Sequence, residues 1–420
     1  MEKSKKEVEN TKKVEVVQKP KNKSNIGIII FLVIIILGLF AYIGYNKGVF
    51  DGLLSNKPSA PESKEEKVEY DFKVVDTDIE EDSYNGMYLI GKFNNNWIEL
   101  DHQNSKLNII GTKDNKLYYS DYKHIKYIDL TDDTHKVNTI YNSNGDTCRG
   151  NINDPAIYGD KIYFELAISC HDSKLVSIEI SDTALNEPKE VLGDVNNYVV
   201  VGDEIYYNVG FHCNDHKFYK YNMNTKKNTL IGTGICSFEI KDNNLIYFKN
   251  NNYYDEKVDK FVYSNNSGYY NYDMNTGKST KIDTVNISFN NDNSMNVLGI
   301  IYDGSVYYID GLKLMKNTNG VNETIYTYNK SDSDSKYRLS LDDLSNGKVF
   351  VIRWEEYREL SEAEIEDPDI TEHVLSDGVL IISDGKAYTE KTARSVLESY
   401  NVTMADGSTR NFSILDTISY

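Results

Sequence analysis

The stretch Asp303-Gly-Ser-Val306-Tyr-Tyr-Ile-Asp310 joins a tight turn to an aliphatic residue and two tyrosines. Similar phrases, a turn followed by an aliphatic anchor and aromatic residues, recur along the chain. They are Lys113-Asp-Asn-Lys-Leu117-Tyr-Tyr-Ser-Asp121, Gly159-Asp-Lys-Ile162-Tyr-Phe, Gly202-Asp-Glu-Ile205-Tyr-Tyr, Asp242-Asn-Asn-Leu-Ile246-Tyr-Phe and Asn346-Gly-Lys-Val349-Phe-Val. The anchors at 117, 162, 205, 246, 306 and 349 are 45, 43, 41, 60 and 43 residues apart. One strand-rich unit in each such period predicts an all-β fold, a β-propeller of four-stranded blades.

Each repeat also contains hairpin signals. Phe218–Asn222 alternates in polarity and leads through a polar turn to Thr229–Ile231, and residues 270–282 repeat this pattern almost letter for letter. Strands joined by turns rich in Asn and Gly indicate hairpins. Six anchors predict six blades, and a seventh blade between anchors 246 and 306 is the alternative.

The two ends of the repeat region are expected to share a blade. Met87–Phe93 and Trp97–Leu100 precede the first anchor and could complete the last blade, together with a final hairpin of residues 400–404 and 410–414. Such pairing removes exposed sheet edges. Trp354–His373 and Thr389–Tyr400 break the repeat, and we expect both to be short helices inserted on one rim.

Tyr118-Tyr-Ser-Asp121 and Tyr307-Tyr-Ile-Asp310 resemble the YWTD repeat of the propellers in low-density-lipoprotein-receptor-related proteins. Bacterial proteins that are membrane-anchored or secreted carry an uncharacterised domain of that type. The resemblance covers about residues 85–390, although two copies keep the aspartate and none has the tryptophan. It implies a six-bladed propeller.

The N-terminal region predicts a single membrane span. Residues 1–25 form a lysine-rich tail, and Ile26 to Tyr45 is a run of twenty residues without a charge. Such a run is long enough for a hydrocarbon core of about 30 Å, and the lysines favour a cytoplasmic N-terminus. The alternative, a cleaved signal peptide, has a shorter apolar run and a small-residue cleavage site. Residues 46–82 are expected to be a flexible extracellular spacer, and residues 83–420 the extracellular propeller domain.

The charge of the chain restricts its partners. The formal net charge is −19, even though the N-terminal tail is basic. An acidic exterior repels nucleic acid, so we expect no nucleic-acid partner.

Two of the four cysteines occupy matching places in neighbouring repeats, and three histidines lie near them. Cys170 and Cys213 each lie eight residues after an anchor, and an even number of extracellular cysteines favours disulfides. We predict Cys148–Cys170 and Cys213–Cys236, with Cys170–Cys213 as the alternative. His171, His212 and His216 lie beside these cysteines and predict a polar site on one rim. Zinc is the alternative reading, but the spacing fits no common zinc module.

Other motifs carry little chemistry. The acidic turns Asp129–Asp133, Asn290–Asn293 and Ser331–Ser335 lack the closing Glu of a calcium loop. The chain shows no Gly-x-Ser-x-Gly, phosphate-binding glycine loop or His-Glu-x-x-His motif. We therefore expect no metal, no cofactor and no enzymatic activity.

The predicted function is that of a membrane-anchored binding, adaptor or sensor module whose partner is an extracellular protein or cell-wall glycan. The alternative is a cell-surface glycan hydrolase or lyase. It would need a central pair of carboxylates, one with a raised pKa. A receptor that signals through the lysine-rich tail is a third hypothesis.

Overall fold

The computed structural model describes residues 70–76, 86–145, 149–181, 185–210, 215–241, 243–255, 260–263, 266–285, 299–329, 336–360 and 372–417. All of them belong to the second of two compact units, Glu69–Tyr420. The expected membrane span, Ile26 to Tyr45, lies outside these residues and stays a prediction. Within the described ranges, no helix is long and apolar enough to cross a bilayer.

Seven sheets of four or five antiparallel or mixed strands make up most of the described chain. Six of them have four strands, and we name each by its anchor. The Leu117 sheet has β4 (Asn108–Lys113), β5 (Lys116–Ser120), β6 (His124–Asp129) and β7 (Val137–Asn142). The Ile162 sheet has β8 (Ile152–Tyr158), β9 (Lys161–Ala167), β10 (Ser173–Glu179) and β11 (Lys189–Gly193). The Ile205 sheet has β12 (Asn197–Val201), β13 (Glu204–Val209), β14 (Lys217–Asn222) and β15 (Lys227–Thr233).

The next three sheets repeat this order. The Ile246 sheet has β16 (Ile235–Lys241), β17 (Asn244–Lys249), β20 (Gly268–Asp273) and β21 (Lys278–Lys281), with the hairpin β18 (Asn252–Asp255) and β19 (Lys260–Tyr263) inserted. The Val306 sheet has β22 (Ile300–Tyr302), β23 (Ser305–Asp310), β24 (Lys313–Thr318) and β25 (Val321–Thr327). The Val349 sheet has β26 (Lys336–Ser345), β27 (Val349–Glu359), β28 (Glu372–Ser383) and β29 (Lys386–Tyr388).

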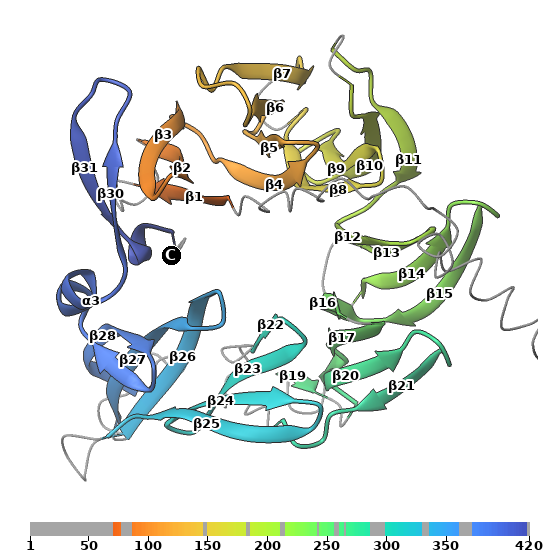
Figure 1. Cartoon of the computed structure of the whole chain (residues 1–420). Coiled ribbons are helices and arrows are strands. Elements are labelled where there is room, and N and C mark those ends of the chain that lie inside the picture. Colours follow the sequence, from red (N-terminus) through yellow and green to blue (C-terminus); the bar gives the residue numbers. More distant parts are fainter. Residues whose placement is uncertain are drawn as a thin grey trace, which may run out of the picture. The chain divides into compact units, whose positions relative to one another are not determined.

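The sheets follow one another in chain order around a common centre, with the first strand of each sheet innermost (Figure 1). This is the arrangement of a β-propeller. Every anchor lies on the second strand of its sheet, so the repeated phrase did predict the position of these six sheets.

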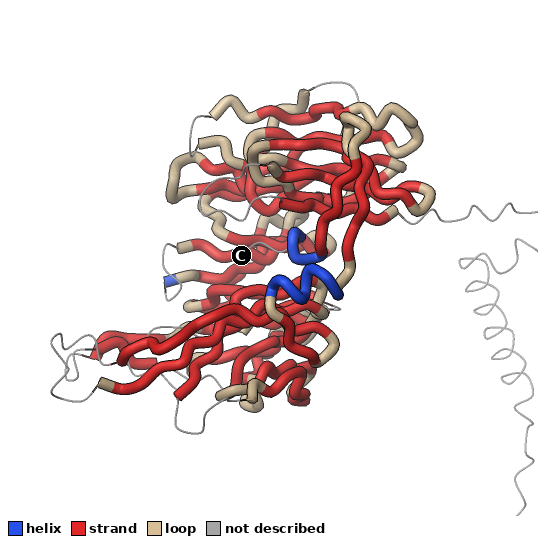
Figure 2. Tube along the Cα trace, turned by 90° about the vertical axis from the view of Figure 1, so that its left-hand side faces the viewer, coloured by secondary structure: helices blue, strands red, loops and turns tan. Residues whose placement is uncertain are grey.

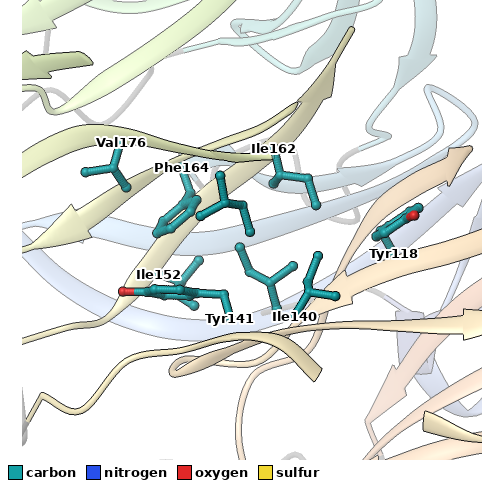
Figure 3. Packing of buried hydrophobic residues seen from close by; sticks show 9 residues of the cluster. Tyr118, Ile140, Tyr141, Ile152, Ile162, Phe164 and Val176 are labelled. Atoms are coloured by element: carbon teal, nitrogen blue, oxygen red, sulfur yellow. The ribbon is translucent and has the colours of Figure 1, made fainter. Parts of the chain in front are cut away.

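Apolar residues fill the spaces between consecutive sheets. Tyr118 of the Leu117 sheet packs with Ile162 and Phe164 of the next sheet (Figure 3). Equivalent clusters join the Ile162 sheet to the Ile205 sheet, and so on to the Val349 sheet. Because both faces of each sheet are covered, its second strand is apolar on both sides, which explains the continuous aliphatic–aromatic phrase.

Two anchors are displaced by one residue from their structural equivalents. Leu117, Ile162, Ile205 and Val306 face the preceding sheet. In the Ile246 sheet this position belongs to Leu245, and in the Val349 sheet it belongs to Phe350. Because side chains alternate along a strand, a shift of one residue turns the anchor to the opposite face.

A repeated contact joins consecutive sheets at two of the junctions. Lys113, at the end of β4, donates to the Gly159 carbonyl and pairs with Asp160 in the β8–β9 turn. Lys241, at the end of β16, pairs in the same way with Asp303 in the β22–β23 turn. Glu239 reinforces that second contact by accepting two backbone N–H groups of this turn.

The two ends of the domain meet in a seventh, closing sheet. Its strands are ordered β1 (Asp71–Asp76), β2 (Met87–Phe93), β3 (Asn96–Gln103), β30 (Ser399–Thr403) and β31 (Thr409–Ser413). The Ala405 N–H donates to Glu99 at 2.9 Å, and Arg410 donates to the Tyr88 hydroxyl at 2.9 Å. The two ends of the domain do pair, but they do not complete the last blade as expected. They form a sheet of their own, and the Val349 sheet has four strands without them.

Other differences concern the irregular segments. Residues 354–359 and 372–373 lie in β27 and β28, so the helix expected there is wrong for these residues, and residues 361–371 lie outside the described chain. The second expected helix is present as α3 (Glu390–Val396), with Thr389 as N-cap, followed by the 3₁₀ helix η2 (Ile414–Thr417). Among the described residues, the interval between anchors 246 and 306 holds the β18–β19 hairpin rather than another four-stranded sheet. β1 falls within the segment expected to be a spacer.

Candidate binding face

The connections between strands differ strongly between the two edges of the sheets. Turns between first and second strands are short, as at residues 159–160, 202–203 and 303–304. Connections between second and third strands include residues 210–216, 250–267 and 360–371. We call the edge with the second-to-third connections the loop edge and the opposite one the turn edge. Near α3, long strands project beyond the other sheets (Figure 2).

The predicted polar rim is only partly described. His171 is exposed in the β9–β10 connection, and His216 is half-buried before β14, so both lie at the loop edge. His212 lies outside the described residues, so the grouping of all three histidines stays a prediction. Among the described residues, no group of three or more His, Cys, Asp or Glu side chains could hold a metal ion.

The cysteines lie at the same edge. Cys170 is in the β9–β10 connection and Cys236 is near the start of β16, and each takes part in a disulfide bond. Cys148 and Cys213 lie outside the described residues. The choice between the two pairings is therefore still a prediction.

His216 is held by two amide side chains. Its Nδ1 lies 3.3 Å from Asn208 Nδ2, and its Nε2 lies 3.5 Å from Asn196 Nδ2. Asn208 also donates to the carbonyl groups of Ile235 and Cys236, which ties the β13 end to the next sheet. These contacts orient the His216 imidazole and hold the β13–β14 connection in place.

A buried polar position recurs in three consecutive sheets. Ser120, Glu165 and Asn208 each lie three residues after the anchor, on the face toward the following sheet, and are 0, 4 and 0% exposed. In each, one side-chain oxygen finds no hydrogen-bond partner among the described residues: Ser120 Oγ, Glu165 Oε1 and Asn208 Oδ1. Buried polar atoms usually find a protein, water or ligand partner. The sequence contains a signal for these polar positions, because Ser, Glu and Asn follow the aromatic pairs at 118–119, 163–164 and 206–207. We did not predict these positions from the sequence.

Glu165 is the one member of this set with an ionisable side chain. Burial, together with the smaller effect of the nearby charge of Asp154, raises the pKa of Glu165 to about 9. The Asp154 carbonyl accepts a hydrogen bond of 2.8 Å from Tyr198 of the Ile205 sheet. Glu165 is therefore protonated at neutral pH and can act as a hydrogen-bond donor or a proton donor.

An ionic group lies where the Leu117 sheet meets the closing sheet. Lys126 Nζ lies 3.0 Å from Asp121 Oδ2 and 3.4 Å from Asp101 Oδ2, and the Tyr119 hydroxyl donates to Asp101 at 2.8 Å. Asp121 also accepts two backbone N–H groups of the β5–β6 connection and pairs with His124. Although burial opposes its charge, these hydrogen bonds and Lys126 hold the pKa of Asp121 below its ordinary value. The aspartate of the Tyr-Tyr-Ser-Asp phrase thus fixes a turn at the loop edge.

Comparison with known proteins finds similar structures but no similar sequence. No protein-family model matches the chain, and no curated protein matches it by sequence. Puromycin hydrolase is similar in structure, with a TM-score of 0.44 and 9% identity over 81% of this chain and 56% of that one. A TolB protein from Agrobacterium tumefaciens has a TM-score of 0.34 and 9% identity over 76% of this chain and 92% of its own. A puromycin-hydrolysing peptidase from Mycobacterium tuberculosis has a TM-score of 0.42 and 9% identity over 81% of this chain and 58% of that one.

These likenesses concern the fold alone, and this chain spans little more than half of the hydrolase chains. The YWTD-type resemblance stays a prediction. One expectation is corrected: because peptidases, including prolyl endopeptidases, are among the proteins of similar structure, the expectation that this chain is not an enzyme does not stand.

Proposed function

We propose that this chain is a cell-surface binding protein, held in the membrane by Ile26 to Tyr45, whose propeller binds a protein or a cell-wall glycan through its loop edge. The lysines of residues 1–25 favour an orientation in which the propeller is extracellular. In this proposal the seven sheets are seven blades, and the closing sheet joins the two ends of the ring.

The observation that carries the proposal is the asymmetry between the two edges. The longest connections, the two described disulfide cysteines, and both described histidines of the predicted site lie at the loop edge. At the opposite edge, the turns between the first and second strands of the six anchor sheets have only two or three residues. In repeat folds, insertions concentrate on one face, which is often the binding face.

A matched pair of variants tests this proposal. His171→Ala and His216→Ala change the loop edge, whereas Asp160→Ala and Asp203→Ala change the turn edge of the same two sheets. The full chain in its own membranes is incubated with purified cell-wall glycan and is separately crosslinked to neighbouring proteins. We expect the loop-edge pair to weaken capture and the turn-edge pair to leave it unchanged. Equal effects of both pairs would contradict the proposal.

Glu165 favours a second candidate function, a glycan-active hydrolase or lyase. A carboxyl group that stays protonated at neutral pH next to a second carboxylate is the arrangement that general acid catalysis requires. The test is release of reducing ends from purified cell-wall glycan by the full chain. This candidate predicts activity that Glu165→Gln abolishes and Glu323→Gln preserves. No release by the unmodified chain would exclude it for that substrate.

A further inference from the structure

β28 is unlike the third strand of the other five four-stranded sheets. It has 12 residues, whereas β6, β10, β14, β20 and β24 have 6 or 7. The fourth strand of its sheet, β29, pairs only with Ile381, Ile382 and Ser383. Residues 372–380, which we call the overhang, are therefore paired with β27 on one side and with no described strand on the other.

The overhang presents apolar side chains to solvent. Val374, Leu375 and Val379 are 42, 51 and 39% exposed, and they account for three of the nine exposed large hydrophobic residues in the described chain. Outer strands elsewhere are mostly polar, such as Lys-Asn-Thr-Leu in β15 and Lys-Ser-Thr-Lys in β21. Long apolar edges invite pairing with another strand, and proteins normally protect them with polar or charged residues.

The charge on the overhang restricts what can pair with it. Asp377 is exposed between the valines, and no ion pair or hydrogen bond of its carboxylate is found in the described structure. Two overhangs paired antiparallel around this point would bring two Asp377 carboxylates together, which is unfavourable. A strand with a basic residue opposite Asp377 would gain an ion pair instead.

We propose that the overhang binds an extended peptide that adds as a further strand next to β28, with apolar side chains beside Val374 and Val379 and a basic residue opposite Asp377. Backbone hydrogen bonds would supply affinity, and the alternating side chains would supply selectivity. The overhang extends from the loop edge, so this inference rests on the proposed function and narrows the partner to a polypeptide.

The experiment measures binding of labelled synthetic peptides to the full chain in detergent micelles by fluorescence anisotropy. The probe has nine residues of alternating valine and threonine with one central lysine, and the control probe has glutamate in place of lysine. We expect the lysine probe to bind about 1.4- to fivefold more tightly, the range that one cross-strand ion pair provides. Asp377→Lys should reverse this preference.

Two further variants distinguish binding at the overhang from nonspecific binding to exposed apolar residues. Val379→Lys should abolish binding of the lysine probe, whereas Val321→Lys, at a 70% exposed valine of another outer strand, should leave it unchanged. Circular dichroism checks that each variant is folded. Absence of lysine-probe binding, or binding that Asp377→Lys and Val379→Lys both leave unchanged, would overturn the inference.

Two other outcomes distinguish this inference from the proposed function. The full chain could instead dimerise as its concentration rises. If Val379→Lys prevents this dimerisation and added peptide does not, a second copy of the chain occupies the overhang, and the inference is wrong. If the probes do not bind but the loop-edge histidine variants still reduce capture of a glycan or protein, the inference fails and the proposed function stands.

Discussion

At the scale of single residues, the buried polar groups at the position three residues after the anchor are the main departure from an apolar propeller core. Ser120, Glu165 and Asn208 interrupt the seams between sheets just below the loop edge. The next two equivalents are Phe248 and Ile309, which pack in ordinary apolar clusters. The polar seam therefore occupies one arc of the domain, the same arc that carries the described histidines and cysteines.

Glu165 should make the stability of the protein depend on pH. Between its ordinary pKa of 4.5 and its folded pKa of about 9, the folded state binds more protons than the unfolded state. The free energy of unfolding therefore falls as pH rises through this range. Glu165→Gln removes this dependence and should raise stability by about 1–3 kcal/mol at pH 8.

Urea unfolding at pH 5 and pH 8 measures this effect, with Glu323→Gln on the exposed part of β25 as the control. The Glu165→Gln variant should lose much less stability between the two pH values than the unmodified protein and the control do. Parallel behaviour of all three proteins would show that Glu165 titrates normally.

Two buried serines offer a test of the unpartnered oxygen atoms. Ser120 Oγ has no partner, whereas Ser305 Oγ lies 2.8 Å from Thr318 Oγ1 in an equally buried site. Ser305→Ala should cost about 1 kcal/mol, because it removes a hydrogen bond. Ser120→Ala should be neutral or slightly stabilising. A cost for Ser120→Ala equal to that of Ser305→Ala, measured by urea unfolding, would mean that an ordered water or another group satisfies Ser120.

At the scale of elements, the contact between Glu239 and the β22–β23 turn should affect the stability of that turn rather than of the whole domain. Glu239 accepts the N–H groups of Asp303 and Gly304 at 2.9 and 3.0 Å. Glu239→Ala should therefore speed hydrogen exchange at these two amides by at least about tenfold. Amides of the β8–β9 turn serve as an internal control. Unchanged exchange at residues 303 and 304 would show that Glu239 does not hold this turn.

Sequence patterns predicted the strands for which turn residues and burial by neighbouring sheets favour the same structure. The second strand of six sheets could be placed because it is apolar on both faces and follows a turn. The closing sheet was misplaced because its strands come from both ends of the chain. Asn85-Gly86 precedes its second strand, Met87–Phe93, but β30 and β31 lie more than 300 residues further along the sequence. Trp354–His373 suggested a helix because it is acidic and contains the possible cap Ser361-Glu-Ala-Glu364, yet pairing with β26 and β28 makes residues 354–359 a strand.

The candidate site was less predictable than the fold. The spacing of cysteines and histidines indicated which connections belong to one edge, since equivalent positions in a repeat lie on the same side. The sequence did not indicate that Glu165 is protonated, because that depends on burial by residues of the next sheet such as Tyr198. Nor did it reveal the overhang, whose exposure depends on how few residues of β29 pair with β28.

At the scale of the whole molecule, the closing sheet joins the two ends of the domain. Hydrogen bonds between Glu99 and Ala405, and between Tyr88 and Arg410, join residues more than 300 positions apart. Each sheet has its own apolar interface with the next, and α3 and η2 pack on the last one through Ala393 and Leu415. The loop edge is thus a set of connections held by a closed scaffold, which is what a preorganised binding face requires.

The most direct test of the central claim, that the loop edge binds the partner, is site-directed photo-crosslinking of the full chain in its own membranes. A photoreactive residue replaces His171 at the loop edge in one protein and Asp203 at the turn edge in another, and both positions are exposed. The account predicts one defined adduct, to a protein or a glycan, from position 171 and none from position 203. Equal labelling from both positions, or labelling from position 203 alone, would contradict it.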